Sequence, residues 1–171
     1  WRVDVPFPSW FLAAHGHAAR SQFSGRALGE WGCGVAPVGV NAAFWSGRRV
    51  LLTGHTGFKG GWLSIWLQSL GAQVYGIALA PDSEPCLWSS TGLADRVDGS
   101  FTDLRDQSAL SERVLAFAPE VVFHLAAQPL VRASYRDPVE TYATNVMGTV
   151  NLLDALRRCD SIKAIVVITT D

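Results

Sequence analysis

The sequence is poor in cysteine and carries almost no net charge. Its three cysteines, Cys33, Cys86 and Cys159, lie far apart, and the formal charge of the 171 residues at pH 7 is −1. An odd number of widely spaced thiols fits neither a disulfide framework nor a zinc site. It favours a reducing compartment, so we expect a cytoplasmic protein. The balanced charge gives no electrostatic basis for binding nucleic acid or an anionic membrane.

Long apolar runs are missing as well. No stretch approaches the roughly 18 apolar residues that would span a bilayer. No basic segment precedes the short apolar patch at residues 10–14, so we expect no signal peptide. His15 and His17 have no further ligands nearby and predict no metal site. In contrast, 49% of the residues are hydrophobic, which is enough for the core of one domain of ordinary size.

Residues 1–45 show no sustained helical or strand periodicity. We expect them to be a poorly ordered extension that contributes nothing to the core, with the domain itself in residues 46–171. The sequence begins with Trp1 rather than Met and stops at Asp171, directly after an apolar strand pattern. We therefore expect an N-terminal fragment from which the C-terminal, substrate-binding part is absent.

From Gly47 onward, strand patterns alternate with helix patterns. Strands are predicted over residues 50–53, 74–79, 97–101, 121–125 and 163–169. Helices are predicted from Gly57 to Gly71, over 106–117 and over 138–158. The first of these helices places four large apolar residues on one face: Leu63, Trp66, Leu67 and Leu70. The order predicts an α/β fold, a Rossmann-type doubly wound parallel sheet that is truncated after its fifth strand.

Three glycines at three-residue spacing follow the first predicted strand, in the segment GHTGFKG. Gly54 suits a tight strand-to-helix turn, Gly57 lets a ligand approach the backbone, and Gly60 lets the helix pack closely on its strand. An anion at this helix N-terminus would meet free N–H groups and the positive end of the helix dipole. The common fingerprint is G-x-G-x-x-G rather than G-x-x-G-x-x-G, but the flanking strand and helix favour dinucleotide binding.

Four blocks of sequence resemble the extended short-chain dehydrogenase/reductases, the NAD-dependent epimerase/dehydratase family. They are LLTGHTGFKGGWL, FTDLRD, VVFHLAAQPLVRASYRDPVETYATNVMGTVNLLDAL and VVITTD, and the resemblance covers residues 47–171. Within that group, GHTGFKG, HLAAQPLVRASYRDP and ETYATNVMGT are most similar to the CDP-glucose 4,6-dehydratases. Other nucleotide-sugar dehydratases and epimerases share most of the remaining features.

The resemblance implies a set of cofactor contacts. Asp103 and Leu104 would face the adenine, with Asp103 accepting a hydrogen bond from its exocyclic amine. The glycine turn would hold the pyrophosphate, and small residues after the fourth strand would let the backbone approach the ribose and nicotinamide. The residues implied in cofactor binding are Gly54, Thr56, Gly57, Phe58, Lys59, Gly60, Asp103, Leu104, Leu125, Ala126, Ala127, Gln128 and Thr169.

The end of the second strand departs from the usual pattern. An acidic residue normally holds the ribose 2′-hydroxyl of NAD there, but the sequence has Ala78 and Leu79, with Asp82 a few residues on. No arginine stands at this point to take a 2′-phosphate either. The residues leave NAD and NADP open, and the resemblance favours NAD.

The resemblance also implies catalytic roles. Thr170 and Asp171 match the Ser/Thr-Asp pair of the dehydratases, in which the Asp protonates the departing C6 hydroxyl. Asn145 matches an asparagine that braces the active-site hydrogen bonds. His124 is interpreted as a packed strand-end residue rather than a base. The Tyr-x-x-x-Lys pair that would move the substrate hydroxyl proton does not occur in the sequence.

The resemblance implies that the intact protein is a nucleotide-sugar 4,6-dehydratase. It would convert CDP-glucose to CDP-4-keto-6-deoxyglucose through a transient hydride transfer to bound NAD, in deoxysugar biosynthesis, and would act as a homo-oligomer. The fragment alone is expected to be inactive. The alternatives are another nucleotide-sugar 4,6-dehydratase, an epimerase, or a non-catalytic dinucleotide-sensing module.

Overall fold

The computed structural model describes residues 39–169, which lie within one compact unit, Gly39–Asp171. This unit begins upstream of the boundary expected at residue 46, since Ala42–Trp45 form the short helix α2. The expectation for residues 1–38, and the roles given to Thr170 and Asp171, lie outside the described residues.

Five parallel strands form one sheet, in the order β3-β2-β1-β4-β5. Their bounds are Arg49–Thr53 for β1, Gln73–Ala78 for β2, Asp98–Phe101 for β3, Val121–His124 for β4 and Ala164–Val167 for β5. The predicted Rossmann-type sheet is therefore confirmed. Successive strands are added outward from β1 on one side and from β4 on the other, so the strand order reverses between β1 and β4. Ligands of such sheets bind in the crevice at the carboxyl ends of the two strands where the order reverses.

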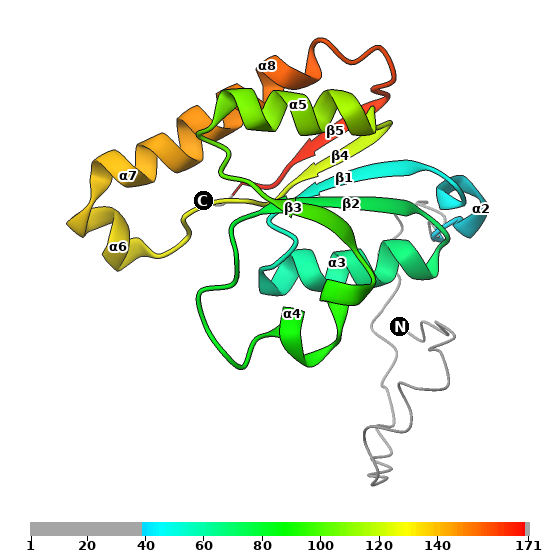
Figure 1. Cartoon of the computed structure of the whole chain (residues 1–171), viewed down its shortest axis with the longest axis horizontal. Helices are drawn as coiled ribbons and strands as arrows, with labels where there is room; N and C mark the ends of the chain where they lie inside the picture. The colour runs from blue at the N-terminus through cyan, green and yellow to red at the C-terminus, as the bar shows by residue number, and fades with distance from the viewer. Residues whose placement is uncertain (1–38, 170–171) are drawn as a thin grey trace, which may run out of the picture. The chain divides into compact units, whose positions relative to one another are not determined.

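Helices cover both faces of the sheet (Figure 1). Figure 1 shows α3 and α4 on one face, and α5 and α8 on the other. The helical segments after α2 are α3 (Phe58–Ser69), α4 (Leu87–Ser90), the 3₁₀ turn η1 (Leu93–Asp95), α5 (Gln107–Phe117), α6 (Val131–Arg136), α7 (Pro138–Tyr142), the π-helical turn η2 (Ala143–Met147) and α8 (Gly148–Leu156). None of the helices within residues 39–169 is both long enough and apolar enough to span a membrane.

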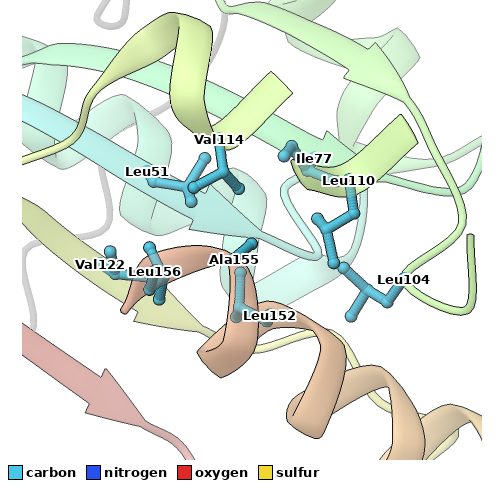
Figure 2. Packing of buried hydrophobic residues seen from close by; sticks show 9 residues of the cluster. All are labelled: Leu51, Ile77, Leu104, Leu110, Val114, Val122, Leu152, Ala155 and Leu156. Carbon is cyan, nitrogen blue, oxygen red and sulfur yellow. The ribbon is translucent and has the colours of Figure 1, made fainter. Parts of the chain in front are cut away.

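Each face of the sheet has its own apolar core. Figure 2 shows the first, where side chains from α5 and α8 meet those of β1, β2 and β4. Its buried members are Leu51, Ile77, Leu104, Leu110, Val114, Val122, Leu152, Ala155 and Leu156. The second core, under α3 and α4, contains Val50, Leu52, Leu67, Val74, Trp88, Leu93, Val97 and Val121. Strand β1 supplies both cores because alternate residues point to opposite faces.

Local signals explain the ends of α5 and α7. The side chain of Asp106 accepts from the backbone N–H of Ala109 at 3.0 Å and caps α5, as predicted. Helix α5 ends at Phe117, and its C-cap Ala118 has a left-handed φ of 50° and precedes Pro119. The side chain of Asp137 likewise caps α7. The predicted long helix over 138–158 is present as α7, η2 and α8 in succession and ends near its expected position.

The predicted apolar face of the first long helix is partly wrong. Trp66 is 43% exposed, whereas the buried positions of α3 are Gly60, Gly61, Ser64 and Leu67. Of these residues, Gly60 packs against the turn after β1, Gly61 lies against Leu87 and Leu93, and Leu67 belongs to the second core, whereas Trp66 faces outward. The short helices α4 and α6 and the turn η1 had no predicted counterpart.

Helix α2 provides a test of where the folded domain begins. Trp45 is half-buried, packs on the second core and lies 6.1 Å from the Phe123 ring between centroids. We expect the full-length protein without residues 1–38 to melt within a few degrees of the parent. Removal of residues 1–45 also removes the indole contact, worth about 1–2 kcal/mol, and should lower the Tm by several degrees more. Equal melting temperatures for the two deletions, measured by calorimetry, would show that α2 contributes nothing.

Candidate functional site

The glycine turn after β1 combines an unusual backbone conformation with very close packing. Gly54 has a φ of 76°, and its N–H donates to the Ile77 carbonyl at 2.8 Å. A Cβ at Gly54 would lie 2.9 Å from the backbone nitrogen of Ala126. A Cβ at Gly60 would lie 2.1 Å from the Gly54 carbonyl oxygen. Both glycines are therefore required by the protein's own structure.

Gly57 is different, because nothing within the protein requires it to be glycine. It has an extended conformation with a φ of −76°, and a Cβ there would meet only the Gly54 oxygen, at an ordinary 3.4 Å. It is also the N-cap of α3 and offers no side chain to the first-turn N–H groups. An open backbone at a helix N-terminus is the arrangement that receives a phosphate group. The residues present thus fit a dinucleotide pyrophosphate.

The other predicted residues of this turn have distinct environments. The hydroxyl of Thr56 donates to the Leu79 carbonyl at 3.0 Å and ties the turn to the end of β2. Phe58 is 73% exposed, and Lys59 is exposed as well. Leu79 is 59% exposed, so the strand end that lacks an acidic residue is open.

A buried polar chain joins the ends of β1 and β4. The backbone N–H groups of Leu125 and Ala126 both donate to Thr53 Oγ1, at 3.2 and 3.1 Å. With both of its lone pairs used, this hydroxyl donates its own proton to His124 Nδ1 at 2.7 Å. The ring then carries its proton on Nε2 and donates to Thr149 Oγ1 at 2.9 Å.

This chain assigns His124 a structural role. Its ring is 3% exposed, and burial lowers its pKa, so it stays neutral and holds one tautomer. The predicted packing role is consistent with this geometry. The sequence offered no signal for Thr53 or Thr149, whose hydroxyls are ordinary until the fold brings them to His124.

Asn145, in the turn η2, is hydrogen-bonded to Gln128, in the loop after β4. Asn145 Oδ1 accepts from the Gln128 N–H at 2.7 Å, and Asn145 Nδ2 donates to the Gln128 carbonyl at 3.1 Å. The Gln128 side chain in turn donates to Thr141 Oγ1 at 3.0 Å. Asn145 therefore fixes the loop that starts with Leu125 and Ala126. Its proposed part in catalysis stays a prediction.

The predicted adenine contacts are near one another in sequence but differ in exposure. The Asp103 side chain is 31% exposed and pairs with Arg105. Leu104 is only 5% exposed and belongs to the first core, so it has only its backbone to offer a ligand. Thr169 is exposed and follows β5, just beyond Ile168, whose N–H donates to the His124 carbonyl at 3.0 Å.

His55, inside the glycine turn, was not singled out in the sequence. Its ring is 1% exposed, its Nδ1 has no hydrogen-bond partner, and its edge contact with Trp88 has a centroid distance of 4.8 Å. A Cβ at Gly76 would lie 2.3 Å from this ring. The ring lines a cavity of about 220 Å³, whose other lining residues are Trp88, Ala94, Val97, Gly99, Ser100 and Phe101. Burial lowers the pKa of His55 to about 4, partly opposed by the Ile77 carbonyl.

Comparison with known proteins agrees with this geometry. Among solved structures, UDP-glucose 4-epimerase from Thermus thermophilus in complex with NAD superimposes with a TM-score of 0.60 and 31% identity, covering 68% of this chain and 36% of that one. The corresponding epimerase of Brucella ovis, also with NAD, gives a TM-score of 0.60 and 28% identity, covering 70% of this chain and 35% of that one. The fold is thus that of the Rossmann-type nucleotide-sugar enzymes.

A family model described as GDP-mannose 4,6 dehydratase matches residues 51–171. The chain belongs to this family of extended short-chain dehydrogenase/reductases. CDP-glucose 4,6-dehydratase of Salmonella typhimurium is 51% identical over 132 residues, which are 77% of this chain and 37% of that protein. GDP-mannose 4,6-dehydratase of Vibrio cholerae is 31% identical over 64% of this chain and 31% of that protein. The chain thus spans about a third of the length of these relatives.

The buried His55 predicts a specific pH dependence of stability. Its pKa of about 4 in the folded state lies below the ordinary histidine value of 6.5. The unfolded chain therefore binds a proton first as the pH falls, and the free energy of unfolding drops between pH 6.5 and about 4, then levels off. A shift of this size corresponds to about 3 kcal/mol.

His55→Phe keeps the ring shape but cannot titrate. Urea denaturation of the full-length protein at several pH values should show that the variant loses less stability than the parent between pH 6.5 and 4. His124 is present in both proteins and cancels in the comparison. Parallel pH profiles for the two proteins would mean that the folded His55 is not held neutral.

Proposed function

We propose that the full-length protein is an NAD-dependent nucleotide-sugar 4,6-dehydratase that converts CDP-glucose to CDP-4-keto-6-deoxyglucose. The observation that carries the dinucleotide assignment is Gly57, a glycine that the protein's own packing does not require, at an uncapped helix N-terminus. The substrate assignment is supported by the 51% identity to CDP-glucose 4,6-dehydratase of Salmonella typhimurium. The choice of NAD is supported by the NAD complexes of the Thermus thermophilus and Brucella ovis epimerases.

The chain's own residues would bind and orient the cofactor. The N–H groups of the first turn of α3 receive the pyrophosphate, and Asp103 accepts from the adenine amine. The loop held by Thr53 and Asn145 forms the floor beneath the nicotinamide. When bound, NAD supplies the temporary acceptor for the hydride from C4 of the sugar, and it is regenerated within the same cycle.

The proton chemistry of the elimination is assigned to the chain after β5. Loss of water across C5 and C6 requires an acid for the departing hydroxyl, because hydroxide is a poor leaving group. Asp171 is proposed as that acid, with Thr170 beside it and Asn145 bracing the neighbouring hydrogen bonds. The Tyr-x-x-x-Lys pair would be supplied by sequence beyond the 171 residues.

Two glycine variants separate ligand binding from folding. Gly57→Val places a branched side chain in the space proposed for the pyrophosphate, and its Cβ meets only the Gly54 oxygen. In the full-length protein it should leave the melting temperature nearly unchanged and abolish NAD binding in calorimetric titration. Gly60→Ala is the matched control, and it should destabilise the fold, because its Cβ would overlap the Gly54 carbonyl. A folded Gly57→Val protein with undiminished affinity would remove this turn from the cofactor site.

Asp171→Asn tests the elimination step in the full-length protein. The amide keeps the shape of the side chain but removes the proton, so formation of the 4-keto-6-deoxy product should slow about 10²–10⁴-fold. The preceding oxidation at C4 should change less, since it relies on other groups. Samples quenched early and separated by chromatography should therefore contain the CDP-4-ketoglucose intermediate. Product formation at the parental rate would show that Asp171 is not the acid.

The second candidate is an epimerase or a dehydratase for another nucleotide sugar. It is favoured by the similarity in fold and sequence to the Thermus thermophilus epimerase. Incubation of the full-length protein with CDP-glucose, GDP-mannose and UDP-glucose, followed by product analysis, distinguishes these activities. Binding of NAD without turnover of any of the three sugars would favour the dinucleotide-sensing module.

A homo-oligomeric state and a cytoplasmic location also belong to this proposal. Helices α7 and α8 and the turn η2 expose a row of apolar side chains at helical spacing: Val139, Tyr142, Val146, Val150 and Leu153. Such a row is uncommon on the surface of a protein that stays monomeric. Light scattering on the purified full-length protein would determine its oligomeric state.

A further inference from the structure

Arg105 lies between two carboxylates that come from different parts of the chain. Its Nε donates to Asp103 Oδ2 at 2.9 Å and to Oδ1 at 3.0 Å, and its Nη2 also donates to Oδ2. Its Nη1 donates to both oxygens of Glu140, on α7, at 2.6 and 2.5 Å. The guanidinium thus links the loop after β3 to the helix α7.

The backbone around this arginine is firmly held. The N–H of Arg105 donates to Asp103 Oδ1 at 2.9 Å. Leu104 is buried in the first core, and its carbonyl accepts from Asn151 Nδ2 at 2.9 Å. The Asp103 carboxylate is therefore fixed by the Arg105 backbone N–H and by the Nε and Nη2 groups of the planar guanidinium, which together are called the fork.

The fork uses most of the acceptor capacity of Asp103. A carboxylate has about four lone-pair directions, and three N–H groups of Arg105 point at that of Asp103, with the single Nε hydrogen shared between the two oxygens. One direction remains for a further donor, and the side chain is 31% exposed. The hydrogen bonds from Arg105 also lower the pKa of Asp103, so the carboxylate stays ionised and can only accept.

We propose that Arg105 is a positioning residue for adenine recognition, which holds Asp103 with one acceptor direction free for the exocyclic amine. The proposal rests on the proposed function, in which Asp103 contacts the adenine. Arg105 itself need not touch the dinucleotide. Its ion pairs are partly exposed, and pairs of this kind contribute little to folding stability. Their effect should instead appear in binding, because a carboxylate that is already ordered loses less conformational freedom when the ligand arrives.

A pair of dinucleotides isolates the amine contact in the full-length protein. Nicotinamide hypoxanthine dinucleotide carries a carbonyl oxygen where the adenine of NAD carries its amine. The parent should bind NAD more tightly than this analogue by calorimetric titration. In Arg105→Gln, the NAD affinity should fall about 3- to 10-fold while the affinity for the analogue changes little, so the preference shrinks.

Three further variants sharpen the comparison. Asp103→Ala should remove the preference completely. Glu140→Gln keeps the fork on Asp103 and should reduce the preference less than Arg105→Gln does. Arg105→Lys preserves the charge but not the planar set of donors, so its preference for NAD over the analogue should lie between those of the parent and Arg105→Gln. If Arg105→Gln does not fold, Arg105→Lys replaces it in the comparison. Arg113→Gln, at an exposed arginine on α5, is the control that should bind like the parent.

The outcomes separate this inference from the function on which it rests. Equal losses of affinity for both dinucleotides in Arg105→Gln would make the arginine a general structural element and overturn the proposal. A parent that binds both dinucleotides equally would overturn it too, while leaving dinucleotide binding intact. A parent that binds neither would overturn the proposed function itself.

Discussion

The hydroxyl of Thr53 is the interaction on which the geometry of the candidate site depends. It lies at the end of β1, is fully buried, and accepts from two successive N–H groups at the start of the loop after β4. The Thr53 hydroxyl donates a hydrogen bond to His124, and His124 donates in turn to Thr149 on α8. An unpaired buried donor or acceptor costs about 1–3 kcal/mol. Displacement of one group in this series of hydrogen bonds would therefore leave its neighbour unpaired, so the groups hold one another in place.

This chain brings the loop after β4 against the turn after β1. The Gly54 backbone lies so close to Leu125 and Ala126 that a Cβ at residue 54 would overlap the backbone of the loop after β4. Asn145 extends the same rigid loop to Gln128. The two loops at the carboxyl ends of β1 and β4 are therefore held backbone to backbone, with the small residues Gly54 and Ala126 at their contact. A flat ligand can approach such a surface closely, which suits the ribose and nicotinamide of a dinucleotide.

The sequence predicted the strands well because each is a short apolar run between clear turn signals. β4 reads as Val-Val-Phe-His, and three of these four side chains are buried. The apolar face of α3 was misjudged because Trp66 is apolar, whereas the buried positions include Gly60, which packs against the turn after β1, and Ser64, whose hydroxyl donates to the Gly60 carbonyl. The π-helical turn η2 has no sequence signal, since it adds one residue to a helix whose apolar pattern continues across it.

The candidate site was predictable where a residue acts through its backbone and unpredictable where it acts through a distant partner. Gly54 and Gly60 could be recognised from their spacing together with the strand and helix patterns that flank them. His55 could not, because its burial depends on Gly76, which lies 21 residues later and leaves space for the ring. The pairing of Arg105 with Glu140 likewise appears only when α7 folds back over the loop after β3.

The three glycines of the turn look equivalent in the sequence, but the structure restricts the three positions differently. Gly54 is fixed by its positive φ and by the neighbouring loop, and Gly60 by the packing of α3 on that same turn. Each would be retained in a protein that had lost its ligand, because folding alone requires it. Gly57 has neither restriction, so a related protein that no longer bound a dinucleotide could carry a side chain there at little cost. Of the three positions, only Gly57 is therefore a glycine that the packing of the fold does not require.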